Sequence, residues 1–213
     1  LARQAADAGA DGLLVVTPYY SKPSQAGLIE HFTTVADATD LPIMLYNNPP
    51  AYRTLIDNDV LAALVDVANI VAVKDAKSDL TASATVMAAT DLAYYSGDDA
   101  ITLPLLAVGA VGVVGTSTHF SGREVRRMIE AYGSGDVAEA LRLHRQLLPI
   151  FTGVFATQGC ILVKAGLELQ GNAYARISKT ATGGIGSLVP LRPDTVTSRR
   201  LPGGEIEYSY SAN

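Results

Sequence analysis

The sequence lacks features that several protein classes require. Its 213 residues include one cysteine, which excludes an internal disulfide framework and fits a reducing compartment such as the cytoplasm. Its three histidines are scattered without the spacing of metal ligands, so we expect no metal site. No apolar run approaches the roughly 20 residues of a membrane span. The net charge of −5 argues against nucleic acid or a membrane surface as the main partner.

The chain is rich instead in short apolar runs that alternate with amphipathic stretches. Hydrophobic residues make up 48% and charged residues 17%, a balance typical of a sheet covered on both faces. The expected strands are residues 12–17, 42–46, 69–74, 92–96 and 112–115. The expected helices between them are residues 24–38, 57–67, 79–89 and 100–108. Because each crossover is long enough to hold a helix, the pattern predicts an α/β fold with a parallel sheet.

The repeat length suits either an eight-stranded TIM (β/α)8 barrel or a doubly wound open sheet. No glycine-rich dinucleotide fingerprint follows any strand, which favours the barrel. A barrel needs about three more strands than the sequence provides. Residues 1–9 already read as the end of a helix, so we expect a barrel that lacks its first three strands.

Beyond the fifth strand the pattern changes to helices with no strand between them. These are expected at residues 122–132, 136–155 and 160–169. The sequence therefore predicts three regions. They are residues 1–121 as the C-terminal part of the barrel, 122–171 as a helical C-terminal appendage and 172–213 as an irregular tail.

Polar side chains stand where the expected strands end. Lys74 closes one strand, Tyr46 closes the strand before it, and Tyr20 follows the first strand. In a barrel these residues lie on the C-terminal rim, where active sites are built. A lysine beside apolar neighbours is partly desolvated, so its neutral amine can attack a ketone and form an imine. A tyrosine on the adjacent strand suits the proton transfers of that reaction.

These residues also have a simpler interpretation. Lys74 is followed by Asp75, and a lysine beside an aspartate at a strand end is often a solvated rim residue. Tyr46 and Tyr20 are equally compatible with packing on the rim. The residues alone leave both interpretations open.

Four segments in this order and spacing resemble the dihydrodipicolinate synthase family, within the superfamily of pyruvate-dependent class I aldolases and N-acetylneuraminate lyase. They are residues 16–25 (VTPYYSKPSQ), 45–49 (LYNNP), 71–76 (VAVKDA) and 95–99 (YSGDD). The resemblance extends over residues 1–171. It implies a TIM barrel with a helical appendage and a homotetramer built from dimers. It also implies a lyase that uses no metal and no organic cofactor.

The resemblance implies roles for individual residues. Lys74 would form the imine with pyruvate, and Tyr46 would be the acid/base over it. Tyr20 would be a relay tyrosine that reaches into a neighbouring subunit's site. Gly97 and Val114 would line the pyruvate pocket.

The chain also departs from the family pattern. The family's Thr-Thr segment, which completes the proton relay, belongs to strands that are expected before Leu1. The family carries an arginine shortly after the tyrosine segment, where it binds the carboxylate of the aldehyde substrate. In an alignment without gaps this chain has Ala51 at that position, and Arg53 follows two residues later. We expect Arg53 to take this role only if the loop is shaped differently. The tail from residue 172 does not resemble the family's ending.

The resemblance implies one leading function and leaves two alternatives. The leading function is condensation of pyruvate with aspartate semialdehyde to 4-hydroxy-tetrahydrodipicolinate, in lysine and diaminopimelate biosynthesis. A related lyase or aldolase on 2-keto-3-deoxy sugar acids or N-acetylneuraminate is favoured only by the altered loop at residues 48–53. The third possibility, from another class, is a truncated non-catalytic fragment that serves as a binding or assembly subunit.

Overall fold

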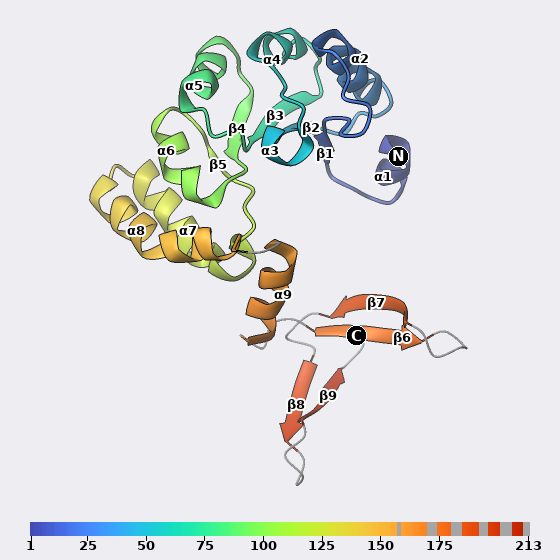
Figure 1. Ribbon diagram of the computed structural model, residues 1–213, viewed down its shortest axis with the longest axis vertical. Coiled ribbons are helices and arrows are strands. Elements are labelled where there is room, and N and C mark those ends of the chain that lie inside the picture. The colour runs from blue at the N-terminus through green and yellow to red at the C-terminus, as the bar shows by residue number, and fades with distance from the viewer. Residues whose placement is uncertain (157–158, 170–173, 180–184, 192–195, 201–205, 211–213) are drawn as a thin grey trace. The chain divides into compact units, whose positions relative to one another are not determined.

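The computed structural model describes residues 1–156, 159–169, 174–179, 185–191, 196–200 and 206–210. The chain divides into two compact units, Leu1–Thr152 and Gly153–Asn213, which are described separately. The first unit contains the predicted parallel sheet with its helices (Figure 1).

The sheet of the first unit has five parallel strands in the order β1-β2-β3-β4-β5, so strands that follow one another in the chain lie side by side (Figure 1). They are β1 (Leu13–Val16), β2 (Ile43–Asn47), β3 (Ile70–Asp75), β4 (Ala93–Ser96) and β5 (Gly112–Val113). Each lies within or beside the range that the sequence predicts. A doubly wound sheet reverses its strand order at a switch point, whereas this sheet does not, so its topology is that of a barrel wall.

The helices of the first unit are α1 (Ala2–Asp7), α2 (Gln25–Ala36), α3 (Pro49–Tyr52), α4 (Asn58–Leu64), α5 (Leu80–Ala89), the 3-10 helix η1 (Asp99–Ile101), α6 (Thr102–Ala107), α7 (Thr118–Gly133) and α8 (Val137–Gly153). The longer helices that connect consecutive strands cover one face of the sheet. Figure 1 shows α2, α4, α5 and α6 following one another along the outer side of the strands. Helix α3 interrupts the connection after β2, where the sequence pattern predicts no helix.

The two faces of the sheet differ in burial because side chains alternate along each strand. The helix-facing side chains of β2 and β3, including Ile43, Leu45 and Val73, are buried in the hydrophobic core. On the other face the side chain of Leu14 is 50% exposed. This inner face carries a hollow of about 440 Å³. Its lining is Gly12, Leu13, Leu14, Pro42, Ile43, Met44, Val71, Ala72, Ala93 and Tyr95.

The second unit contains helix α9 (Gly159–Leu169) and two antiparallel strand pairs. Strand β6 (Tyr174–Lys179) pairs with β7 (Ile185–Leu191), and β8 (Val196–Arg200) pairs with β9 (Ile206–Tyr210). Within residues 172–213, where the sequence predicts an irregular tail, the described residues include these four strands. Polar residues interrupt β6, β8 and β9, and Gly186, Ser187 and Pro190 interrupt β7, so none shows the continuous apolar run that marks the strands of the barrel. The predicted domain boundaries at 121 and 171 stay predictions.

We predict that the chain self-associates through the inner face of its sheet. Exposed apolar sheet surface and unpaired edge strands favour association in water. Leu14→Glu places a charge on this face and should lower the concentration-dependent rise in sedimentation coefficient. Val137→Glu is the matched control, because Val137 on α8 is similarly exposed at 54%. Equal association of both variants would contradict the prediction.

Candidate active site

The pairing of β2 with β3 brings Lys74 and Tyr46 together. The two residues are partners in the parallel register, so their side chains leave the same face of the sheet. The Nζ atom of Lys74 lies 4.1 Å from the centroid of the Tyr46 ring. On its other side, Lys74 pairs with Tyr95 of β4. Lys74 therefore stands between two aromatic residues near the C-terminal ends of the strands.

Burial changes the proton affinity of Lys74. The side chain is half-buried, and desolvation lowers the pKa of its amine, while the negative charge of Asp99 raises it and so opposes the larger effect. A lysine with a lowered pKa carries more of the neutral amine at a given pH. The neutral amine is the form that attacks a carbonyl carbon.

Asp99 is a buried carboxylate that three hydrogen bonds hold in place. Its Oδ2 accepts from the backbone N–H groups of Thr116 (3.0 Å) and Ser117 (3.4 Å), and its Oδ1 accepts from the Ser117 hydroxyl (2.7 Å). A Cβ on Gly115 would lie 2.2 Å from Oδ1, so only glycine fits beside this carboxylate. The carboxylate is thus a fixed acceptor whose charge acts on Lys74.

Gly97 packs directly against the lysine. Its N–H donates to the Asp75 carbonyl at 2.7 Å, and a Cβ at this position would lie 3.1 Å from Lys74 Cγ and 3.0 Å from Ala76 Cβ. The missing side chain leaves room for the stem of Lys74. Val114 follows β5, and its N–H donates to the Ser96 carbonyl at 2.8 Å. The predicted roles of Gly97 and Val114 in pyruvate binding stay predictions.

Asn48 connects Tyr46 to α3. Its Nδ2 donates to the Tyr46 hydroxyl at 2.8 Å, and its Oδ1 accepts from the N–H of Ala51 at 3.2 Å, which caps α3. Asn48 is not among the site residues that the sequence predicts. The available signal was an asparagine followed by Pro49 and Pro50, since asparagine is a preferred N-cap and proline is favoured at the first helical position.

The aromatic ring of Tyr52 lies edge-on to Tyr46, with 5.8 Å between the ring centroids. The ring of Tyr19 also lies near Tyr52, with 6.1 Å between the ring centroids. Burial raises the pKa of Tyr52, and the neighbouring tyrosines raise it further. The three rings form an aromatic cluster beside Lys74.

The alternative interpretation was that Lys74, followed by Asp75, is a solvated rim residue, whereas in the structure its side chain is half-buried. Asp75 lies on the helix-facing side of the sheet, where it forms a buried ion pair with Lys77. The Ser83 hydroxyl donates to Asp75 at 2.6 Å. Since successive residues of a strand point to opposite faces, Lys74 projects from the other side.

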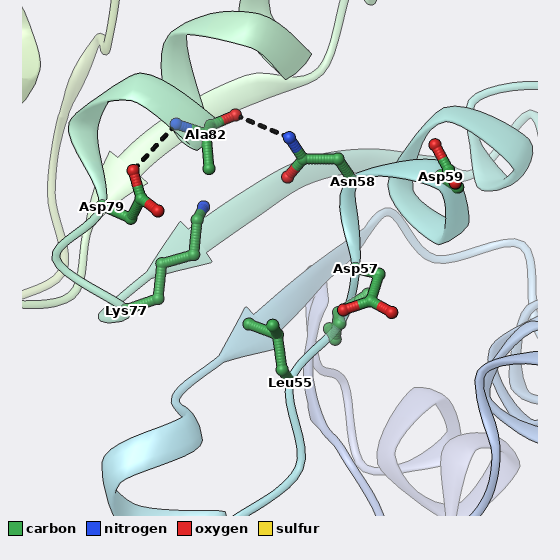
Figure 2. Close-up of a pocket in the computed structure, with 8 residues that line it drawn as sticks. Leu55, Asp57, Asn58, Asp59, Lys77, Asp79 and Ala82 are labelled. Carbon is green, nitrogen blue, oxygen red and sulfur yellow. Dashed lines mark hydrogen bonds between the residues drawn. The ribbon is translucent and has the colours of Figure 1, made fainter.

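The Lys77 side chain also borders a hollow of about 340 Å³ between the starts of α4 and α5 (Figure 2). There Asp79 caps α5 by accepting from the N–H of Ala82, and the Ala82 carbonyl accepts from Asn58. The remaining polar lining residues are Asp57 and Asp59. In the part of the chain that the structure describes, no group of three or more histidine, cysteine or acidic residues could hold a metal ion.

The chain matches the model of the dihydrodipicolinate synthetase family over residues 1–180. It belongs to that family. It is 64% identical over 182 residues to a 4-hydroxy-tetrahydrodipicolinate synthase of Cutibacterium acnes, an alignment that covers 85% of this chain and 62% of the relative. It is 63% identical to the enzyme of the same name from Acidothermus cellulolyticus, over 80% of this chain and 56% of that one.

Solved structures agree with this assignment. The dihydrodipicolinate synthase of Cyanidioschyzon merolae with lysine bound superposes with a TM-score of 0.78 at 42% identity, over 80% of this chain and 59% of that chain. The dihydrodipicolinate synthase from Aquifex aeolicus superposes with a TM-score of 0.76 at 38% identity, over 78% of this chain and 58% of that chain. The structural relatives are TIM barrels, which confirms the predicted fold class. The chain spans about three fifths of the length of the relatives that it matches.

The structure does not bring every predicted site residue to the lysine. Arg53 ends α3 in the left-handed conformation, with φ of 52°, and its side chain is exposed. Tyr52, rather than Arg53, contacts the Tyr46 ring. Tyr20 is 95% exposed. The roles that the family resemblance implies for Arg53 and Tyr20 stay predictions.

Of the helices within the described ranges, none is long and apolar enough to cross a membrane.

Gly97→Ala should slow imine formation at Lys74. The added Cβ would contact Lys74 Cγ and Ala76 Cβ more closely than ordinary packing allows, so the lysine stem must move. Reductive trapping with pyruvate and borohydride measures the rate. Gly122→Ala in α7 is the control, because its Cβ meets nothing within 4 Å and alanine stabilises a helix by about 0.5–1 kcal/mol. Unchanged trapping in Gly97→Ala would show that the close packing has no role.

Asp99→Asn should shift the pH dependence of trapping to lower pH. Trapping rises with pH as Lys74 loses its proton, and burial has already lowered the pKa of that amine. The charge of Asp99 raises the same pKa, so removing it lowers the pKa further and the rise begins at lower pH. Asp91→Asn, at an exposed position, is the control. A shift to higher pH, or none, would contradict the assigned charge interaction.

Proposed function

We propose that this chain carries the imine-forming half of a 4-hydroxy-tetrahydrodipicolinate synthase, which condenses pyruvate with aspartate semialdehyde. The observation that carries the proposal is the position of Lys74. Its partly desolvated amine lies over the ring of Tyr46 on the inner face of the sheet, near the strand ends. An amine of this kind is a nucleophile for a ketone, and the adjacent phenol is a suitable acid/base.

The reaction follows from these groups. The neutral amine of Lys74 attacks the keto carbon of pyruvate, and one proton of the amine passes to the former carbonyl oxygen. Tyr46 gives the resulting hydroxyl a second proton, so it leaves as water and a protonated imine remains. The resulting imine loses a proton from the pyruvate methyl carbon and becomes an enamine. The enamine carbon then forms a bond with the aldehyde carbon of the second substrate. The amino group that aspartate semialdehyde carries then attacks the imine carbon and displaces the neutral amine of Lys74, so one water is lost over the whole reaction.

The remaining residues take the roles that the family pattern implies. Gly97 and Val114 line the pyruvate pocket, and Arg53 binds the carboxylate of the aldehyde. Tyr20 completes the proton relay in a neighbouring subunit of a homotetramer that is a dimer of dimers. The site lies in the cytoplasm, and the chemistry requires only the protein's own side chains.

The relatives support the synthase over the related sugar-acid lyase. Six curated relatives at 48–64% identity are all 4-hydroxy-tetrahydrodipicolinate synthases. The loop that favours the lyase places Tyr52 beside Tyr46 and leaves Arg53 exposed. This arrangement concerns recognition of the second substrate and leaves the imine chemistry unchanged.

Reductive trapping tests the proposal. We expect incubation with pyruvate and borohydride to add one pyruvyl group at Lys74, as located by peptide mass mapping. Lys74→Arg should abolish the adduct, because arginine stays protonated and cannot form the imine. Lys22→Arg, at an exposed position, should keep it. No adduct on folded protein, or one spread over other lysines, would favour the non-catalytic fragment.

The second substrate needs a separate assay. We expect pyruvate to be consumed with L-aspartate semialdehyde and to give a product of their combined mass less one water. Turnover with N-acetylmannosamine in place of the semialdehyde would assign the chain to the lyases. A Lys74 adduct without turnover of either aldehyde would place only the first half-reaction on this chain.

A further inference from the structure

Asn48 makes two hydrogen bonds that fix the orientation of its side-chain amide. The N–H of Ala51 is a donor, and the oxygen of the Asn48 side-chain amide faces it at 3.2 Å, beside the Asn48 backbone carbonyl, which accepts from the same N–H at 3.2 Å. With the oxygen committed to the cap of α3, the amide nitrogen faces Tyr46 at 2.8 Å. Rotating the amide by 180° would set two donors against each other at the cap and is excluded on chemical grounds.

This orientation decides which way the hydrogen bond to Tyr46 runs. An amide NH2 group donates and does not accept, so the Tyr46 oxygen is the acceptor. The phenol therefore keeps its own proton for another partner. The Tyr46 ring is also held in place, because Tyr52 packs edge-on against it and the Lys74 amine lies over its face.

We propose that Asn48 is a positioning residue that occupies the acceptor side of the Tyr46 hydroxyl and leaves its proton directed to the imine chemistry at Lys74. The inference rests on the proposed function, in which Tyr46 is the acid/base. It also assigns a purpose to α3. This helix has only four residues, begins with two prolines and is capped by Asn48. The prolines restrict its backbone, so the helix holds Asn48 and Tyr52 in fixed positions.

Asn48→Asp separates the two tasks of the side chain. Aspartate caps a helix as well as asparagine does, so α3 should persist. The second carboxylate oxygen, however, accepts hydrogen bonds and cannot donate one, so the Tyr46 hydroxyl must turn its proton toward it. Asn48→Ala removes both interactions. Ser24→Ala is the matched control, because Ser24 caps α2 through Gly27 N–H and does not contact Tyr46.

Two readouts report separately on the hydrogen bond of Tyr46 and on the reaction at Lys74. The first is the Cζ resonance of Tyr46 in protein labelled with [13Cζ]tyrosine, assigned with Tyr46→Phe. This resonance moves downfield when the phenol donates more strongly. The second is the rate of pyruvate trapping on Lys74. In Asn48→Asp we expect the downfield shift and trapping slowed on the order of 100-fold, the scale of losing a general acid. Asn48→Ala should slow trapping less, and Ser24→Ala should change neither readout.

The outcomes separate this inference from the proposed function. Wild-type trapping rates in Asn48→Asp, or a Cζ resonance that does not move, would overturn the inference. A slowed Asn48→Ala together with an equally slowed Ser24→Ala would also overturn it, because cap loss alone would then explain the effect. If the wild-type chain traps no pyruvate, the proposed function fails, and the Cζ resonance still decides whether Asn48 directs the Tyr46 proton.

Discussion

The register between β2 and β3 is the constraint on which the site depends. Tyr46 pairs with Lys74 only because β3 contains one extra residue early in the strand: Ile43 pairs with Ile70, and the next residue, Met44, pairs with Ala72. Without this irregularity Tyr46 would lie opposite Val73, a residue of the core. A shift of one residue moves a side chain to the opposite face of a sheet. The bulge thus places the core residues toward the helices and the lysine toward the tyrosine.

The charges around the site are divided between the two faces of the sheet. Asp75 is paired with Lys77 on the helix-facing side, so Asp75 does not act as the counter-ion of Lys74. On the other side Lys74 has no carboxylate within ion-pair distance among the described residues, and Asp99 acts on it through its charge alone. The amine is therefore a partly desolvated base and not half of a salt bridge. This arrangement suits a nucleophile better than a structural lysine.

The sequence predicted the elements that follow from periodicity and the residues at the strand ends. The strands of the barrel, Lys74 and Tyr46 belong to this group, since apolar runs and strand termini are visible in one dimension. The amide orientation of Asn48 and the approach of Tyr52 depend on α3, a helix too short to show a period. The strands from Tyr174 onward escaped prediction because polar residues, glycine or proline interrupt their apolar runs. Local pattern indicates Lys74 as the candidate nucleophile, whereas the residues around it are brought together by tertiary contacts.

Formation of an enamine between pyruvate and Lys74 is measured most directly by exchange of the pyruvate methyl protons in D2O, followed by proton NMR. An enamine on Lys74 takes up solvent deuterium at the methyl carbon when it reverts to the imine, with no second substrate needed. The account predicts loss of the methyl signal with the wild-type chain and background exchange with Lys74→Arg. Exchange in Lys74→Arg as fast as in the wild type would contradict it, because the enamine would then form without this lysine.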